Sequence, residues 1–194
     1  MLNRAARPAG FTLVEILITL AIIAMVIAFG FPSMRVWLQN TQLRNAADSI
    51  LGGLQSARIE ALKRNTTVAF ELTDPNSTAW HVCLFDIPSD ACSPGDLLAA
   101  PGSSSSNARV GVETAFTNYA APLNAGSGVP ALVAFDSFGR VSPSSPVNIA
   151  RIDLRNPTLA AGDERRLSIR IETAGEVHMC DPQLSKAVNP QGCQ

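Results

Sequence analysis

The sequence has 194 residues and a mass of 20.5 kDa, which is room for one ordinary domain or a small domain with an appendage. Fifteen Lys and Arg oppose sixteen Asp and Glu, and the resulting net charge of −1 excludes a generally basic nucleic-acid binder on charge alone. With 46% hydrophobic and 16% charged residues, the chain is too apolar to be mainly disordered.

The apolar residues concentrate in one run near the N-terminus, from Phe11 to Phe31, which contains a single charge, Glu15. As a helix this run spans about 30 Å, the thickness of one hydrocarbon core. The residues before it include Arg4 and Arg7 and no acid, which favours keeping that end in the cytoplasm. The sequence therefore predicts a single-pass membrane segment, with the chain after Phe31 on the side away from the cytoplasm.

The start of this run differs from an ordinary secretory signal. The small residues Ala9 and Gly10 precede the run, and residues 32–35 after it are not an Ala-x-Ala cleavage site. Any cleavage therefore leaves the apolar helix on the mature protein. Glu15 is also unusual, because a carboxylate within an apolar helix is costly unless it is paired or close to the interface.

Residues 10–15, Gly-Phe-Thr-Leu-Val-Glu, resemble the type III signal of type IV pilins and type II secretion pseudopilins. The resemblance implies that a prepilin peptidase cuts after Gly10 and methylates the amine of Phe11. It makes Glu15 the acidic residue of the family, used in assembly, and places Pro32 where many pilins carry a helix-bending proline. A positive amine at Phe11 of one subunit would pair with Glu15 of a neighbour inside a low-dielectric bundle.

After Pro32 the apolar residues keep helical spacing, which predicts one long helix over about 11–64. Gly30 with Pro32, and the pair Gly52-Gly53, are its weak points. The predicted core face consists of Leu43, Ala47, Ile50, Leu51, Leu54, Ala57, Ala61 and Leu62.

From Thr66 onward, short runs rich in Val, Ile, Phe and Thr predict β-strands. The runs are Thr67–Leu72, Trp80–Phe85, Arg109–Phe116, Ala131–Phe135, Val147–Leu154, Arg166–Glu172 and Glu176–Cys180. Residues 173–175 and 138–140 predict tight turns, and the polar stretches 86–108 and 118–130 predict surface loops.

The four cysteines, Cys83, Cys92, Cys180 and Cys193, all follow the apolar run, and in an exported domain they predict two disulfides. Three connectivities are open. We favour the near pairs, Cys83 with Cys92 and Cys180 with Cys193, because each closes a short loop. Neither spacing is the Cys-x-x-Cys of a zinc or redox site.

Residues 57–68, residues 135–141 and the closing stretch 166–193 resemble the GspH/FimT/FimU group of minor pilins and pseudopilins. The resemblance implies an α+β, type IV pilin-like fold: a long N-terminal helix packed on an antiparallel β domain of two small sheets. It divides the chain into a leader (1–10), a transmembrane and assembly helix (11–32), an amphipathic helix (33–65) and a periplasmic β-rich pilin domain (66–194). The terminal cysteine pair favours the FimT/FimU branch.

No motif for catalysis, phosphate binding or calcium binding is present, so we predict no enzyme activity, no catalytic residue, no cofactor and no metal. His81 and His178 are expected to be structural or exposed. The acidic residues Asp86, Asp90 and Asp96 are expected to lie in a solvated loop.

DNA binding is the rival function. Some FimT-type pilins bind DNA through a C-terminal Gly-Arg-x-Arg motif, and the matching residues here, 175–178, read Gly-Glu-Val-His. From Thr66 to Gln194, eight Lys and Arg stand against thirteen Asp and Glu, a net charge of −5. Arg166 and Arg170 remain weak DNA-contact candidates, within a stripe that includes Arg151, Arg155 and Arg165.

The sequence thus predicts a minor type IV pilin that supports pilus assembly and twitching motility, near the tip or in a priming complex. Its expected partners are other minor and major pilins, the prepilin peptidase and the inner-membrane assembly platform. The alternatives are a GspH-type pseudopilin of a type II secretion system and a DNA-binding pilin for natural transformation.

Overall fold

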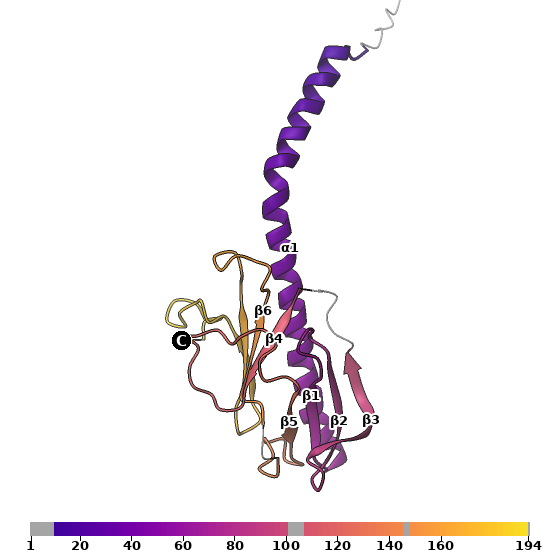
Figure 1. The fold of residues 1–194 in the computed structure, drawn as a ribbon, viewed down its shortest axis with the longest axis vertical. Helices are drawn as coiled ribbons and strands as arrows, with labels where there is room; N and C mark the ends of the chain where they lie inside the picture. The colour runs from indigo at the N-terminus through magenta and orange to yellow at the C-terminus, as the bar shows by residue number, and fades with distance from the viewer. Residues whose placement is uncertain (1–9, 101–106, 146–147, 194) are drawn as a thin grey trace, which may run out of the picture. The chain divides into compact units, whose positions relative to one another are not determined.

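The computed structural model describes residues 10–100, 107–145 and 148–193, except for the side chains at positions 30 and 32. One helix, α1 (Leu13–Arg64), is followed by eight strands (Figure 1). The chain divides into two compact units, Met1–Trp37 and Leu38–Gln194, which are taken in turn below. The predicted fold class, a long helix followed by antiparallel sheets, is confirmed.

The first unit holds the N-terminal part of α1. Its large apolar side chains are exposed along the helix, with Leu20, Met25 and Val26 between 56% and 66% exposed. Among the described residues, no single helical segment meets the length and composition expected of a membrane span, but Leu13–Phe29 and Ser33–Arg64 meet them when taken together.

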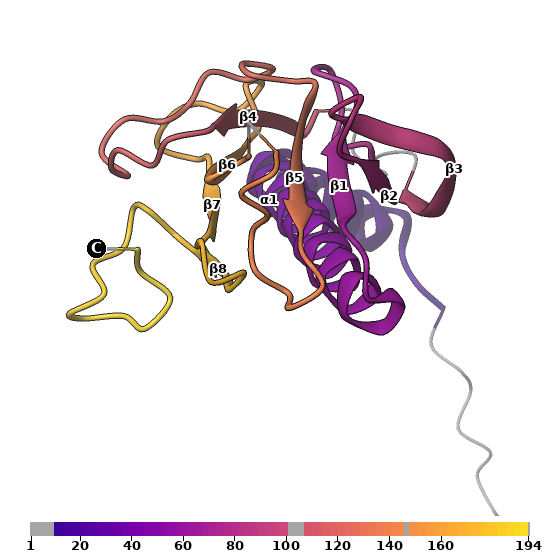
Figure 2. The ribbon, with the colours of Figure 1, turned by 90° about the horizontal axis from the view of Figure 1, so that it is seen from below.

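The second unit contains two four-stranded antiparallel sheets. The first sheet has the order β3-β2-β1-β5 and comprises β1 (Val68–Leu72), β2 (Trp80–Asp86), β3 (Ala91–Ala100) and β5 (Ala131–Phe135). The second sheet has the order β4-β6-β7-β8 and comprises β4 (Arg109–Glu113), β6 (Arg151–Arg155), β7 (Leu167–Ile171) and β8 (Val177–Cys180). Figure 2 shows the C-terminal part of α1 with β1 and β5 on one side and β6, β7 and β8 on the other.

One hydrophobic core joins α1 to both sheets. Ile50 and Leu54 of the helix are fully buried, together with Phe70 of the first sheet and Ile152 and Ile169 of the second. Six of the eight residues of the predicted core face are buried in this way, whereas Leu51 is half-buried and Leu62 is 49% exposed. The three-and-four spacing therefore identified the helix face that packs on the sheets.

The prediction of a surface loop over 86–108 is wrong for residues 91–100, which form β3. This strand contains Pro94, Gly95 and Asp96, residue types that are depleted in strands, and its pairing with β2 shifts register on both sides of Cys83. Local strand propensity therefore does not predict β3. The strand is stabilised by its pairing with β2 and by the Cys83–Cys92 disulfide. Residues 101–106 of the predicted loop lie outside the described residues.

The remaining predicted strands are present with shifted ends. The run predicted to start at 147 begins as β6 at Arg151, and the run predicted to reach Phe116 ends as β4 at Glu113. The turn at 173–175 joins β7 to β8, with the amide of Gly175 donating to the carbonyl of Glu172 at 2.8 Å. The turn at 138–140 is also present, closed by the amide of Gly139 donating to the carbonyl of Asp136 at 2.8 Å.

Candidate functional site

The residues predicted for processing and assembly lie together where α1 begins. Gly10 and Phe11 precede the helix, Phe11 is 80% exposed, and Glu15 is exposed in the first helical turn. The hydroxyl of Thr12 accepts a hydrogen bond from the backbone amide of Glu15 at 3.2 Å and so caps the helix. A carboxylate in the first turn is also favoured by the helix dipole.

Thr12 was not singled out from the sequence, although the signal was available. Thr12 and Glu15 have the spacing of a capping box, in which a hydroxyl residue stands three positions before a glutamate. The fourth assembly candidate, Pro32, lies within α1, but its side chain is outside the described part of the structure. The leader residues 1–9 are likewise outside it.

The structure distributes the predicted arginine stripe along the second sheet. Arg151, on β6, is the most buried member, with 1% of its side chain exposed. Its Nε donates to Asp153 Oδ1 at 2.8 Å and its Nη2 to Asp153 Oδ2 at 2.6 Å. Its guanidinium also donates to the carbonyls of Asn118 and Ala121, so it holds the 118–121 segment against the sheet.

Asp153 is fully buried and completes this network. It accepts hydrogen bonds from Ser168 Oγ at 2.5 Å and from the backbone amide of Leu123 at 3.0 Å, in addition to those from Arg151. The predicted loop over 118–130 is therefore fixed to β6 and β7 by a buried ion pair. A buried charge pair that keeps all its hydrogen bonds specifies one loop position, because removing either partner leaves an uncompensated charge.

Three of the other four arginines are also engaged, whereas Arg165 is exposed. Arg155 pairs with Glu164 at 3.1 Å, and Arg170 lies 4.2 Å from the centre of the Phe116 ring and 3.6 Å from Glu172. Arg166 donates to the carbonyl of Tyr119 at 3.2 Å, and burial lowers the pKa of its guanidinium, an effect that the charge of Asp153 opposes. Four of the five arginines of the stripe are thus matched by carboxylates or loop contacts, which differs from the free positive field that phosphate binding needs.

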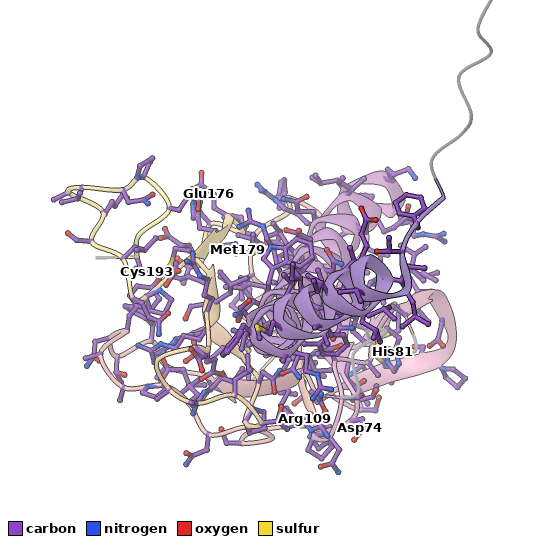
Figure 3. All side chains as sticks on the ribbon, turned by 90° about the horizontal axis from the view of Figure 1, so that it is seen from above. Asp74, His81, Arg109, Glu176, Met179 and Cys193 are labelled. Carbon is purple, nitrogen blue, oxygen red and sulfur yellow. A yellow bond between two sulfur atoms is a disulfide. The ribbon has the colours of Figure 1, made fainter. Side chains whose placement is uncertain are left out.

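The residues in the position of the DNA-binding motif lie at the turn between β7 and β8. Gly175 is in the turn with φ +81°, and Glu176 forms an exposed pair with His178, whose Nε2 is 3.3 Å from Oε2 of Glu176. Figure 3 shows Glu176 at the surface of the unit. An exposed carboxylate therefore stands where the motif has its first arginine.

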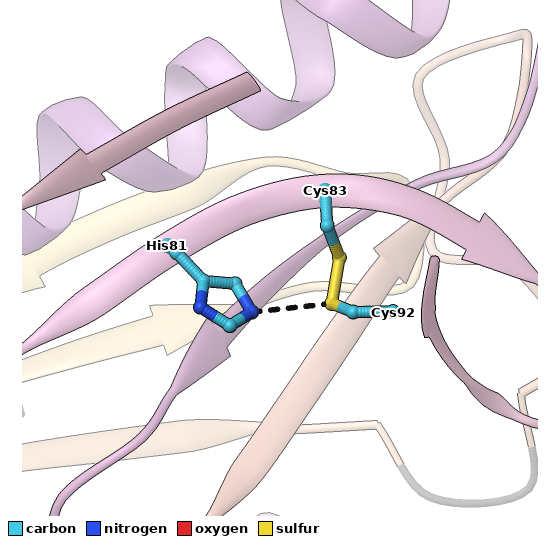
Figure 4. Close-up of side chains that lie close together, drawn as sticks. All are labelled: His81, Cys83 and Cys92. Atoms are coloured by element: carbon cyan, nitrogen blue, oxygen red, sulfur yellow. Dashed lines mark hydrogen bonds between the residues drawn. A yellow bond between two sulfur atoms is a disulfide. The ribbon is translucent and has the colours of Figure 1, made fainter. Parts of the chain in front are cut away.

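Both cystines join near neighbours in the chain. Cys83 is bonded to Cys92 and Cys180 to Cys193, which is the favoured one of the three connectivities, and no cysteine is free. His81 is next to the first disulfide, with its Nε2 3.3 Å from Sγ of Cys92 (Figure 4). The same nitrogen lies 3.1 Å from Oε2 of Glu71, and Nδ1 lies 3.7 Å from Oδ1 of Asp96. Asp96 therefore lies in a strand and not in the predicted loop, although its side chain is still 53% exposed to solvent.

Comparisons with known proteins match two regions of the chain. The family model described as type II transport protein GspH matches residues 46–175, and the model of the prokaryotic N-terminal methylation motif matches residues 6–31. Two crystal structures of the type IV minor pilin FimU of Pseudomonas aeruginosa are similar in fold, each at 15% sequence identity. One has a TM-score of 0.51 and covers 81% of this chain and 99% of its own; the other has a TM-score of 0.48 and covers 78% and 99%. No curated protein sequence matches this chain.

Proposed function

This chain belongs to the GspH family and carries the prokaryotic N-terminal methylation motif, and from that premise we propose that it is a minor type IV pilin. The observation that carries the proposal is the junction at residues 10–15. Gly10 and Phe11 directly precede a helix that has Glu15 in its first turn and exposed apolar side chains along its length, in the order of the motif. An exposed apolar helix needs lipid or other apolar helices around it.

The proposed steps from synthesis to the fibre rest on that junction and, for the position near the tip, on what the family resemblance implies. The N-terminal helix inserts once into the inner membrane with the β domain in the periplasm. The prepilin peptidase then removes residues 1–10 and methylates the amine of Phe11. The assembly platform moves the mature subunit into the fibre, where it contacts other minor and major pilins near the tip, in a priming complex that supports pilus assembly and twitching.

In the proposed assembly step, Glu15 provides the charged contact between neighbouring subunits. It is exposed in the described helix, and the capping contact at Thr12 uses its backbone amide, which leaves its carboxylate available. In a helical bundle this carboxylate would pair with the Phe11 amine of a neighbouring subunit. Such a pair sets the register between helices, because an unpaired charge in an apolar bundle is penalised.

Intact-mass measurement of the purified mature protein tests the processing. We expect the loss of ten residues, the gain of one methyl group and the loss of four thiol hydrogens. A protein that keeps residues 1–10, or one that is trimmed behind Phe31 and has lost the helix, contradicts the proposal. A chain cut after Gly10 without the methyl group contradicts the methylation step alone.

A type II secretion pseudopilin is the second candidate, and the description of the matching family model favours it. The two functions predict opposite deletion phenotypes in the source organism. For a pilin, deletion should abolish twitching and leave secreted enzymes at their normal level. For a pseudopilin, deletion should retain twitching and keep those enzymes inside the cell.

A further inference from the structure

Four side chains with metal-binding chemistry meet on the outer face of the first sheet. Glu71 on β1 is the register partner of His81 on β2. Cys83 follows two residues after His81 and therefore points to the same face. Cys92 on β3 reaches this face through its disulfide with Cys83. Three neighbouring strands thus contribute a carboxylate, an imidazole and two sulfurs to one place.

The distances from His81 Nε2 to its neighbours are close to those around a tetrahedral metal, whereas the sulfurs of Cys83 and Cys92 are bonded to each other. The ligand atoms of His81, Cys83 and Cys92 all lie within 4.8 Å of one another. His81 Nε2 is 3.3 Å from Cys92 Sγ and 3.1 Å from Glu71 Oε2. Around a tetrahedral zinc ion, ordinary bond lengths place a nitrogen about 3.5 Å from a sulfur and about 3.3 Å from an oxygen. Reduction of the Cys83–Cys92 bond and separation of the two sulfurs to about 3.8 Å are therefore needed to seat the ion.

The second nitrogen of the histidine faces a carboxylate that lies beyond hydrogen-bond distance and is 53% exposed. Nδ1 of His81 lies 3.7 Å from Oδ1 of Asp96, which is the register partner of Cys83 on β3. Metal-bound histidines commonly direct their other ring N–H at a carboxylate, which fixes the ring and strengthens the ligand. Asp96 is therefore suited to orient His81 with Nε2 toward the sulfurs.

We propose that the reduced form of this protein binds Zn²⁺ through Cys83, Cys92, His81 and Glu71. A dithiol reductant supplies two electrons to the Cys83–Cys92 bond and itself becomes a disulfide, leaving two thiols on the protein. Zn²⁺ then displaces the two thiol protons and binds both thiolates. In the reverse direction, a disulfide oxidant takes two electrons from the bound thiolates, forms the cystine and releases Zn²⁺. The disulfide and the metal therefore exclude each other.

Either the Cys83–Cys92 disulfide or the bound zinc ion would hold β3 against β2. The strand β3 is an edge strand with two register shifts and residue types that are poor in strands, so it depends on a crosslink more than its neighbours do. Cys83 is fully buried, whereas Cys92 is half-buried. A zinc ion at this position would keep β3 in place while the cystine is open.

Cobalt substitution in the full chain, purified in detergent and reduced with a dithiol, tests the proposal. We expect one equivalent of Co²⁺ to give the strong visible bands of a tetrahedral site and thiolate-to-cobalt charge transfer, both removed by Zn²⁺. The oxidised protein should give none of these bands. His81→Ala should weaken Zn²⁺ binding by at least about 100-fold, and Asp96→Asn by about tenfold.

The second cystine provides the matched control. In Cys180→Ser/Cys193→Ser the cobalt spectrum should be unchanged, whereas Cys83→Ser/Cys92→Ser should abolish it. A reduced protein that keeps its far-UV circular dichroism and binds no Co²⁺ overturns the proposal, as does a spectrum that His81→Ala leaves intact. If reduction alone unfolds the β domain, Zn²⁺ added before the reductant should preserve its circular dichroism, and failure to do so also overturns the proposal.

Discussion

The Asp136 carboxylate organises the turn that leaves β5. Its Oδ1 accepts hydrogen bonds from the backbone amides of Phe138 at 2.9 Å and Arg140 at 3.0 Å, and its Oδ2 accepts one from Arg140 Nη2 at 3.0 Å. Burial raises the pKa of this carboxyl, but the hydrogen bonds from Arg140 and Phe138 outweigh burial, so the pKa lies below its ordinary value of 3.8. The charged form is therefore the one that stabilises the turn.

Asp136→Asn should accordingly destabilise the fold only where the carboxylate is charged. Because the folded pKa is depressed, the stabilisation is complete above the ordinary value of 3.8 and is lost as the pH falls through the folded value. We expect the free energy of unfolding to drop by about 1–2 kcal/mol near neutral pH. Urea denaturation of both proteins across a pH series checks this: a difference that persists undiminished at the acidic end contradicts the role of the charge.

At the scale of elements, the two adjacent glycines of α1 have different roles. A Cβ added at Gly53 would lie 2.8 Å from the Phe70 ring and 3.0 Å from the Trp80 ring, whereas one added at Gly52 meets nothing within 4 Å. Gly53 therefore lets the helix approach the first sheet, where the Trp80 Nε1 donates to Ser49 Oγ at 3.1 Å. The sequence analysis predicted that this glycine pair weakens the helix; at Gly53 the glycine is instead required for close packing against the first sheet.

Substitution by alanine should separate these roles. Gly52→Ala should stabilise the protein by about 0.5–1 kcal/mol, because alanine loses less backbone entropy in a helix. Gly53→Ala should destabilise it by about 1–3 kcal/mol, because the new methyl group overpacks the contact with two aromatic rings. Thermal unfolding followed by circular dichroism measures both variants, and stabilisation by Gly53→Ala would show that the rings move aside freely.

The loop fixed by Arg151 and Asp153 supplies a second test at this scale. Asp153→Ala leaves the guanidinium of Arg151 buried beside Glu113 alone, at 3.5 Å, and should cost about 3–5 kcal/mol. Arg151→Ala/Asp153→Ala should cost less than the sum of the single changes, because the double variant removes both fully buried charges and leaves only the partly exposed Glu113 without its partner. Denaturant midpoints of the three variants give the coupling, and strict additivity would contradict a cooperative network.

At the scale of the whole molecule, the sequence predicted what depends on local patterns. Helical spacing identified α1 and its core face, and alternation with turn residues located seven of the eight strands. It missed β3 because that strand depends on pairing with β2. It also missed the contacts of Arg151 with residues 118 and 121, about thirty positions away, because only the fold brings them together. Likewise, His81, Glu71 and Asp96 meet only through strand register.

The charge of the molecule argues against DNA capture. The chain from Thr66 onward has a net charge of −5, and Arg155 and Arg170 are both beside carboxylates. We therefore expect no shift of duplex DNA in gels at low salt with up to micromolar protein, because phosphate binding needs a clustered positive field. Micromolar binding that is abolished by Arg166→Ala and Arg170→Ala would instead make this chain a DNA-binding pilin.

Assembly into a fibre depends on contacts between subunits. Substitution of Glu15 tests the proposed assembly contact most directly. Glu15→Ala should insert into the membrane normally, because the change makes the helix more apolar, but it should leave the Phe11 amine of a neighbour without its partner. A buried charge that loses its partner costs about 3–5 kcal/mol, so incorporation into sheared fibres should fall at least about tenfold. Glu15→Asp keeps the charge and should retain more incorporation than Glu15→Ala. Wild-type amounts of Glu15→Ala in the fibres would mean that register is set elsewhere along the helix.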